Sequence, residues 1–387
     1  MKRKYILSLA AGHASTDMNV GALAAMLPFL IAATGMGYAQ AAGLTFAIAV
    51  TSTAAQPFFG IIADRFSKTW LVPIGVLLSG GGLALIGLLS GHYWLMFSAA
   101  LISGLGVAAF HPEGARMANK LSGEKKGGTM SVFTVGGTIG VASGPLIAAP
   151  LLFYFGLRGS VFLAVPGIIM CAFIFFLIPG MRRLAAANER EEQKAQDLKG
   201  DGQKNEWLLF FWLCVAITFR SIISHSMNTF LPLYWVNDLH QNMATGGIVV
   251  SLKVFVGALV TIASGPLADR FGMANIIKAG WLLMLLPLFF FTETTNPALA
   301  LLLLIPISAG NYGIMVPLIV LGQKCLPKNI GFASGIVLGL GGSIGGVVTP
   351  FLGAYADIHG LAAALRLLAI LPAAGALIAF FSKPPAK

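Results

Sequence analysis

The stretch "GIIADRFSK", Gly60–Lys68, places an Asp, an Arg and a Lys in one short connector between apolar runs. A near copy, "GPLADRFGM", Gly265–Met273, starts 205 residues later. Charged residues make up 10% of the 387-residue chain, so a repeated charged connector is not expected from composition alone. The repetition indicates that the chain consists of two related halves.

Two further landmarks share this offset. "GGTIGVASGPLIAA", starting at Gly136, matches "GGSIGGVVTPFLGA", starting at Gly341, and Pro112 matches Pro317. About six helices fit into each half, and an even number of spans gives both halves the same orientation in a membrane. We therefore predict a parallel duplication of two six-helix bundles around a central cavity, an arrangement suited to alternating access.

Composition indicates an integral membrane protein. The chain is 57% hydrophobic with a mean hydropathy of +0.84, whereas a soluble domain carries roughly 25% charged residues. The apolar runs are long and do not alternate as barrel strands do, which predicts an all-α protein. We expect twelve transmembrane helices near residues 5–33, 40–62, 70–90, 94–118, 128–154, 159–180, 206–236, 243–267, 274–293, 297–323, 329–356 and 361–381.

The net charge of +11 is explained by topology rather than by an acidic ligand. With a cytosolic N-terminus, nearly all Lys and Arg residues fall on the cytosolic side, which is the positive-inside bias. Both termini are then cytosolic, in a bacterial inner membrane. The polar stretch 182–205 predicts a cytosolic linker between an N-terminal bundle, 1–181, and a C-terminal bundle, 206–387.

The charged connectors resemble the loop 2–3 signature of the major facilitator superfamily. By this resemblance they form gate contacts on the cytosolic side, and the alternative is a pair of topology-setting basic turns. An Asp there can cap a helix N-terminus of the other half, a contact that breaks when the halves separate. The expected gate residues are Asp64, Arg65, Lys68, Arg116, Asp269 and Arg270.

The fifth span resembles the antiporter signature of the same superfamily. Gly136, Gly140 and Gly144 recur every four residues on one helix face, and Pro145 follows. Ser131 replaces the leading glycine of the signature. The resemblance favours export, while plain packing of small residues between helices is the alternative reading.

Four stretches resemble the fosmidomycin-resistance branch of the superfamily, whose members are similar to proton-coupled drug exporters. They are "GHASTDMNVGALAAMLPFL", "AAFHPEGARMA", "FTVGGTIGVASGPLIAA" and "KCLPKNIGFASGIVLGLGG". In this superfamily, spans 1, 4, 7 and 10 line the cavity. The resemblance implies efflux of a drug or metabolite and does not identify the solute.

The N-terminal half carries the candidate proton-coupling groups, which are His13, Asp17, His111 and Glu113. His13 and Asp17 are four residues apart and share a helix face. Asp17 lies near the midplane, where it either carries protons or forms a structural hydrogen bond. Glu113 either relays protons with His111 or pairs with Arg116 three residues on.

The C-terminal half carries buried cations. Arg220 lies about 14 residues into its span, too deep to reach the interface, so it needs an acidic partner or an anionic solute. Lys253 either has the same role or extends to the outer surface, and His225 is a ligand or a packed neutral ring. Asn311 and Tyr312 complete the expected substrate-binding set.

We therefore predict a proton-coupled exporter of a small anionic or zwitterionic organic molecule. A proton symporter that imports an organic anion is the alternative. The sequence contains no phosphate-binding loop, paired catalytic carboxylates or His/Cys metal cluster, so neither an enzyme nor a cofactor or metal is expected. The expected partners are the solute, protons and lipid, with no nucleic acid, and the expected state is a monomer.

Overall fold

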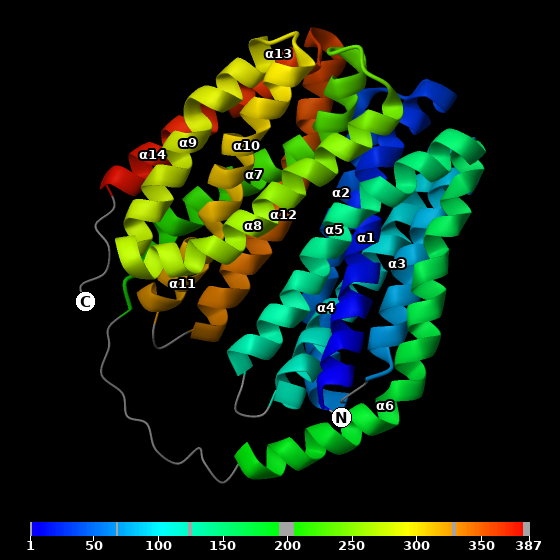
Figure 1. Cartoon of the computed structure of the whole chain (residues 1–387), viewed down its shortest axis with the longest axis vertical. Helices are drawn as coiled ribbons and strands as arrows, with labels where there is room; N and C mark the ends of the chain where they lie inside the picture. The colour runs from blue at the N-terminus through cyan, green and yellow to red at the C-terminus, as the bar shows by residue number, and fades with distance from the viewer. Residues whose placement is uncertain (1, 67–68, 123–125, 193–204, 327–329, 382–387) are drawn as a thin grey trace. The chain divides into compact units, whose positions relative to one another are not determined.

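The computed structural model (Figure 1) describes the chain except for residues 1, 67–68, 123–125, 193–204, 327–329 and 382–387. Within helices, the side chains of further residues, among them 60–66, 126–131 and 338–343, also lie outside the description. The described residues with regular structure are all helical. They divide into two compact units, Met1–Gly35 with Ala47–Asp201 and Met36–Phe46 with Gly202–Lys387.

The first unit consists of long, closely packed helices, shown in blue to green in Figure 1. They are α1 (Lys2–Thr34), most of α2 (Tyr38–Phe66), α3 (Leu71–Leu88), α4 (Tyr93–Ser122), α5 (Lys126–Phe155), the 3₁₀-helix η1 (Gly156–Leu163) and α6 (Ala164–Glu192). Part of its apolar core lies where α1, α3, α4, α5 and α6 meet. Leu9, Val72, Phe110, Phe133 and Ile174 are buried there.

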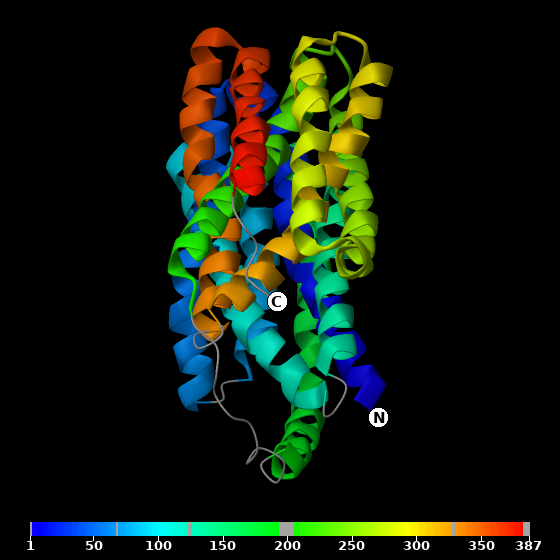
Figure 2. The same cartoon turned by 90° about the vertical axis from the view of Figure 1, so that its left-hand side faces the viewer.

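The second unit has the same character, and Figure 2 shows its last helices in orange and red. Its helices are α7 (Trp207–Asn237), α8 (Met243–Phe271), α9 (Met273–Glu293), α10 (Pro297–Gly313), α11 (Met315–Cys325), α12 (Ile330–His359), α13 (Leu361–Leu368) and α14 (Ile370–Phe381). The beginning of α2, up to Phe46, belongs to this unit as well.

The predicted spans correspond to the observed helices. Within the described residues, nine helical segments are long and apolar enough to cross a membrane, and one of them, 132–188, joins α5, η1 and α6. The other described long helices, α2 and α12, have 29 and 30 residues, as long as helices in this set. The all-α membrane fold is thereby confirmed. The predicted linker 182–205 begins as helix, because α6 continues to Glu192.

Local sequence explains where several helices start and stop. Asn242 and Asn296 accept hydrogen bonds from backbone amides of the first turns of α8 and α10, as N-cap residues do. Gly272, with φ of +87°, ends α8. α10 ends at Gly313, four residues before Pro317, which lacks the N–H that would bond to the Gly313 carbonyl.

The matching proline of the first half behaves differently. Pro112 lies inside α4, which continues through it as one helix. The sequence repeat therefore extends to the position of the proline but not to the break in the helix. Asn311 and Tyr312, which are predicted to bind the substrate, therefore lie next to a helix break, whereas His111 and Glu113 do not.

The glycine face of α5 packs directly on α1, and Figure 1 shows these two helices side by side. A Cβ atom at any of its three glycines would come within 2.2 Å of an α1 carbonyl oxygen (Gly136 against Ala10, Gly140 against Ala14, Gly144 against Met18). In the second unit a Cβ at Gly345, 205 residues after Gly140, would lie 2.2 Å from the Ser221 carbonyl oxygen. Each unit therefore packs its first helix against its fifth span without side chains between the backbones.

Candidate functional site

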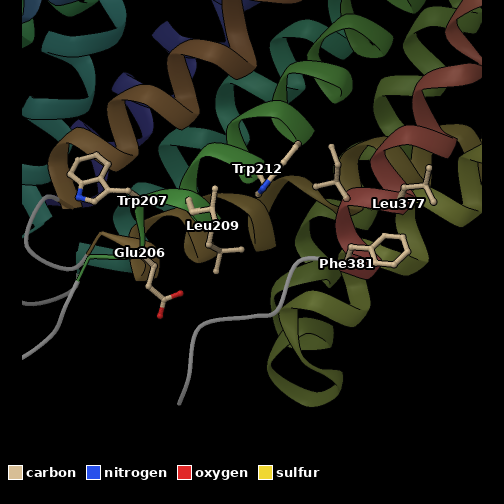
Figure 3. Close-up of a pocket in the computed structure, with 8 residues that line it drawn as sticks. Glu206, Trp207, Leu209, Trp212, Leu377 and Phe381 are labelled. Carbon is tan, nitrogen blue, oxygen red and sulfur yellow. The ribbon is translucent and has the colours of Figure 1, made fainter.

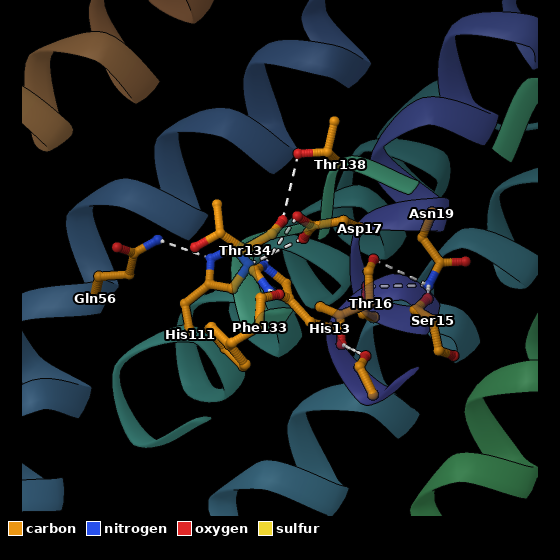
Figure 4. Close-up of polar contacts among 12 residues, drawn as sticks. His13, Ser15, Thr16, Asp17, Asn19, Gln56, His111, Phe133, Thr134 and Thr138 are labelled. Atoms are coloured by element: carbon orange, nitrogen blue, oxygen red, sulfur yellow. Dashed lines mark hydrogen bonds and ion pairs between the residues drawn. The ribbon is translucent and has the colours of Figure 1, made fainter. Parts of the chain in front are cut away.

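A buried polar cluster lies inside the first unit, where α1, α4 and α5 meet (Figure 4). His13 Nε2 lies 3.2 Å from Asp17 Oδ2, and His111 Nε2 lies 3.0 Å from Asp17 Oδ1. The side chain of Asp17 is 15% exposed. The carboxylate is thus held between two imidazole rings, one on its own helix and one on α4.

The outer nitrogens of both rings also have partners. His13 Nδ1 lies 2.8 Å from the backbone carbonyl oxygen of Phe133 on α5. His111 Nδ1 lies 3.5 Å from the side-chain nitrogen of Gln56 on α2. The four helices α1, α2, α4 and α5 therefore all contribute a group to this cluster.

These contacts determine where hydrogens must be. A carbonyl oxygen only accepts, so His13 Nδ1 carries a hydrogen and donates it to Phe133. His13 Nε2 and Asp17 Oδ2 would then face each other with lone pairs unless one of them is protonated. For His111, the Gln56 amide donates to Nδ1, and Nε2–H donates to Asp17. With this assignment of the tautomers, the cluster holds one proton more than two neutral histidines and a carboxylate.

Glu113, the fourth candidate proton-coupling residue, lies apart from the cluster. Its carboxylate is fully buried and accepts two hydrogen bonds from Arg116, at 2.7 Å from Nε and 2.5 Å from Nη2. His111 pairs with Asp17 instead of Glu113. Glu113 was expected either to relay protons with His111 or to pair with Arg116. In the structure it forms the ion pair with Arg116 within α4.

The predicted substrate-binding cations are buried in the second unit. Arg220 is 6% exposed, donates from Nε to the Asn311 carbonyl oxygen at 2.9 Å, and contacts Met315 Sδ with Nη2 at 3.3 Å. Lys253 is 3% exposed and donates to Asn228 Oδ1 at 2.5 Å. Among the described residues, neither cation has a carboxylate partner.

Lys253, Asn311 and Tyr312 line the same small hollow, together with Ser308 of α10. Its volume is about 10 Å³, close to the space one water molecule needs. Asn311 Oδ1 is buried there without a hydrogen-bond partner among the described residues. His225, one turn beyond Arg220, lies against α12 at Gly345. The hollow is therefore too small, as it stands, for an organic solute to reach Lys253.

The structure describes the predicted gate residues of the second connector but not the side chains of those of the first. Asp269 and Arg270 are exposed in the last turn of α8, and the Arg270 guanidinium lies over the Phe271 ring at 5.3 Å. Lys68 lies outside the described residues, as do the side chains of Asp64 and Arg65. The gate role of this connector stays a prediction.

A larger cavity of about 730 Å³ opens between the first turn of α7 and the end of α14 (Figure 3). It is lined by Glu206, Trp207, Leu208, Leu209, Trp212, Leu377, Ile378 and Phe381. Apart from Glu206 its lining is apolar or aromatic, and it contains none of the predicted site residues.

Several groups of the site were not predicted from the sequence. Gln56, the Phe133 carbonyl and Asn228 are partners of predicted residues. Gly137 leaves room for the cluster, since a Cβ there would lie 2.5 Å from His13 Nε2 and 2.7 Å from Asp17 Oδ2. The polar amides within apolar spans were the available signal for Gln56 and Asn228, because burying an amide requires a partner.

The cluster also has a spacing that a metal ion could use. His13, Asp17 and His111 each offer a ligating atom, and these atoms lie within 4.8 Å of one another. The sequence showed no such cluster because His111 is 94 residues from Asp17. Divalent cations are therefore a necessary control in experiments on this cluster.

Known proteins resemble the chain over most of its length. It is 25% identical to the fosmidomycin resistance protein of Escherichia coli strain K12, covering 96% of this chain and 91% of that protein. It is 27% identical to an uncharacterized MFS-type transporter, YfnC, of Bacillus subtilis strain 168. The match covers 94% of this chain and 89% of that protein.

Solved structures share the fold at low sequence identity. A bacterial homolog of the human lysosomal transporter Spinster, in an inward-facing and occupied conformation, superposes with a TM-score of 0.79 at 13% identity, covering 98% of this chain and 96% of that one. The nucleoside transporter NupG superposes with a TM-score of 0.75 at 14% identity, and the match covers 97% of this chain and 98% of that one. The sequence pattern of the Major Facilitator Superfamily matches residues 9–350. The chain, with its all-helical structure and its apolar spans, therefore belongs to the Major Facilitator Superfamily and is a multi-pass membrane transporter.

Proposed function

We propose that the protein exports a small organic anion or zwitterion in exchange for protons, by alternating access. The family consists of transporters rather than enzymes. Relatives named for fosmidomycin resistance and multidrug resistance support efflux. The glycine face of α5 agrees with the antiporter-like signature, although it also serves as a packing surface.

The observation that carries the proton coupling is the contact between His13 and Asp17. Because His13 Nδ1 donates to the Phe133 carbonyl, the 3.2 Å contact between Nε2 and Asp17 Oδ2 requires a proton shared by the pair. Loss of that proton would place two lone pairs opposite each other and drive the groups apart. The pair therefore has a loaded and an unloaded arrangement, which a proton-driven cycle needs.

The observation that supports an anionic solute is the pair of buried cations in the second unit. A buried charge without a counterion is costly, so such groups are retained where a ligand supplies the opposite charge. Arg220 and Lys253 have neutral partners among the described residues. The unpaired Oδ1 of Asn311 can accept a hydrogen bond from a solute donor, as a zwitterion would offer.

The test compares uphill transport with exchange in Asp17→Asn, using fosmidomycin, the compound named by one relative, as the first probe. In everted vesicles with an acidic interior we expect wild-type accumulation of the probe. Asp17→Asn should lose accumulation yet keep exchange of labelled for unlabelled probe without a gradient, because it keeps the fold and loses the proton-carrying group. Glu113→Gln is the matched control, since it removes a buried carboxylate that is outside the cluster.

Three results would contradict parts of this proposal. Full accumulation by Asp17→Asn would exclude Asp17 as the proton carrier. Loss of accumulation in Glu113→Gln alone would assign that role to Glu113. Accumulation driven in the opposite direction would support the symport alternative. The measurements are repeated with a chelator and with added Zn²⁺, so that a metal at the cluster is detected separately.

A further inference from the structure

The helix α2 starts with one local contact, in which the Gln40 side chain accepts a hydrogen bond from the Gly37 amide at 3.3 Å. Its first helical residue is Tyr38, preceded by Gly37, and its first turn contains no acidic residue. The cap comes from the end of α12, where Asp357 Oδ1 accepts a hydrogen bond from the Tyr38 amide at 2.6 Å and Oδ2 accepts one from the Ala39 amide at 3.0 Å. Both carboxylate oxygens thus bind free amides at the positive end of the helix.

The backbone permits this approach because glycines lie at the contact. A Cβ at Gly37 would be 3.0 Å from each Asp357 carboxylate oxygen. A Cβ at Gly353, one turn before Asp357, would lie 2.8 Å from the Tyr38 carbonyl oxygen. The first turn of α2 therefore rests on the backbone of α12 at Gly353, where a side chain would force the two helices apart, whereas a side chain at Gly37 would displace the Asp357 carboxylate.

Two contacts with α7 add to the cap. Asn237 donates from Nδ2 to the Tyr38 hydroxyl at 2.9 Å, and the hydroxyls of Thr45 and Thr229 lie 3.2 Å apart. Asp357 itself is exposed. Water can replace these contacts when they break, so the attachment is reversible.

The position of this contact gives it a mechanical consequence. Residues of α2 up to Phe46 belong to the second unit, and those from Ala47 onward belong to the first. α2 is nevertheless a single helix of 29 residues. If the units move relative to each other, either α2 bends near Phe46 and Ala47 or it stays straight and its first turns detach from α12 and α7.

We propose that Asp357 is a positioning residue that latches the start of α2 to α12 and so sets the balance between the conformations of the transport cycle. This inference rests on alternating access in the proposed function, and it does not depend on the solute or on proton coupling. The positive-inside bias predicts that this end of the helices lies on the outer side, opposite the charged connectors. The latch is thus a contact distinct from the predicted cytosolic gate.

The test measures the separation of the two helix ends by pulsed electron spin resonance. Spin labels are placed at Gln40 of α2 and at Ile358 of α12, both exposed, in a protein whose three cysteines have been replaced by serine. We expect a short-distance population in the otherwise unchanged protein. In Asp357→Ala the ratio of short to long distances between the two labels should fall about five- to tenfold, because the cap is lost.

Two further variants make the result specific. Asp357→Asn keeps an acceptor oxygen and should shift the ratio less than Asp357→Ala. His359→Ala removes another exposed side chain of the same helix end and should leave the distances unchanged. An unchanged distance distribution in Asp357→Ala would overturn the latch. Because the measurement uses neither gradient nor solute, a failure of the latch and a failure of proton-coupled export give different results.

Discussion

At the scale of single residues, the two units hold their buried charges in opposite ways. In the first, Asp17 lies between two histidines and Glu113 is paired with Arg116, so each carboxylate has a basic partner. In the second, Arg220 and Lys253 have neutral partners among the described residues. The carboxylates of the first unit thus have their counter-charges within the protein, whereas the cations of the second would receive theirs from the anionic solute that we propose.

Removing the buried ammonium should therefore stabilise the protein while abolishing transport. For Lys253→Met we expect a higher melting temperature in detergent, corresponding to about 1–4 kcal/mol of unfolding free energy, because an uncompensated buried charge is replaced by an apolar chain of similar length. Fosmidomycin accumulation should be lost. Melting by intrinsic fluorescence and uptake by vesicles are the two measurements.

Lys278→Met is the matched control for that substitution. Lys278 is half-buried in α9, with Nζ 5.0 Å from the Phe380 ring centre, and its replacement should change stability by less than about 0.5 kcal/mol. A marked fall in the melting temperature of Lys253→Met would show that the ammonium is structural, and the anion-binding role would then lose its main support.

At the scale of secondary structure elements, the contact between α1 and α5 joins packing to function. Gly136, Gly140 and Gly144 bring the two backbones together, while Gly137, next to the first of them, faces His13 and Asp17. The same close approach that stabilises the pair of helices places the Phe133 carbonyl within reach of His13. Packing of α5 therefore determines the hydrogen-bond partner of His13 in the cluster that we propose to couple protons.

Gly137→Ala tests this dependence. The added methyl group would come 2.5 Å from His13 Nε2 and 2.7 Å from Asp17 Oδ2, so the pair must separate. We expect loss of proton-driven accumulation with a destabilisation of about 1–3 kcal/mol, the usual range for overpacking. Gly81→Ala in α3 is the control, since a Cβ there meets nothing within 4 Å. Normal proton-driven accumulation by Gly137→Ala would show that the cluster of His13, Asp17 and His111 is not needed for proton coupling.

At the scale of the whole molecule, the duplication and the distribution of charge predict a definite topology. The positive-inside bias places both termini and the charged connectors in the cytosol. The helices give the required connections, because the turns after α3 and after α7 lie at the opposite ends of their spans from the basic connectors. Sidedness in the membrane nevertheless stays a prediction.

Reporter fusions measure it directly. Alkaline phosphatase fused after Gly91 or His240 should be active, since both positions are expected outside, and inactive when fused after Gly272. Green fluorescent protein fused after Lys387 should fluoresce, because it folds in the cytosol. Phosphatase activity after Gly272 would reverse the orientation of the second half and would contradict a parallel duplication.

The amino-acid sequence by itself determined the membrane class of the protein, its duplication and one face of its polar cluster. The length and apolar character of the spans determined the membrane class, because lipid leaves backbone groups no partner outside a helix. The 205-residue offset determined the duplication. The spacing of four between His13 and Asp17 placed them on one face of α1, as helical periodicity requires.

The tertiary structure decided which charges meet across helices. Periodicity places residues on a face of one helix but does not say how far a neighbouring helix is rotated toward it. The rotation of α4 brings His111 to Asp17 and leaves Glu113 to Arg116, a choice the sequence left open. Likewise, that Asp357 caps α2 across 319 residues depends on glycine contacts that exist only once the helices have packed.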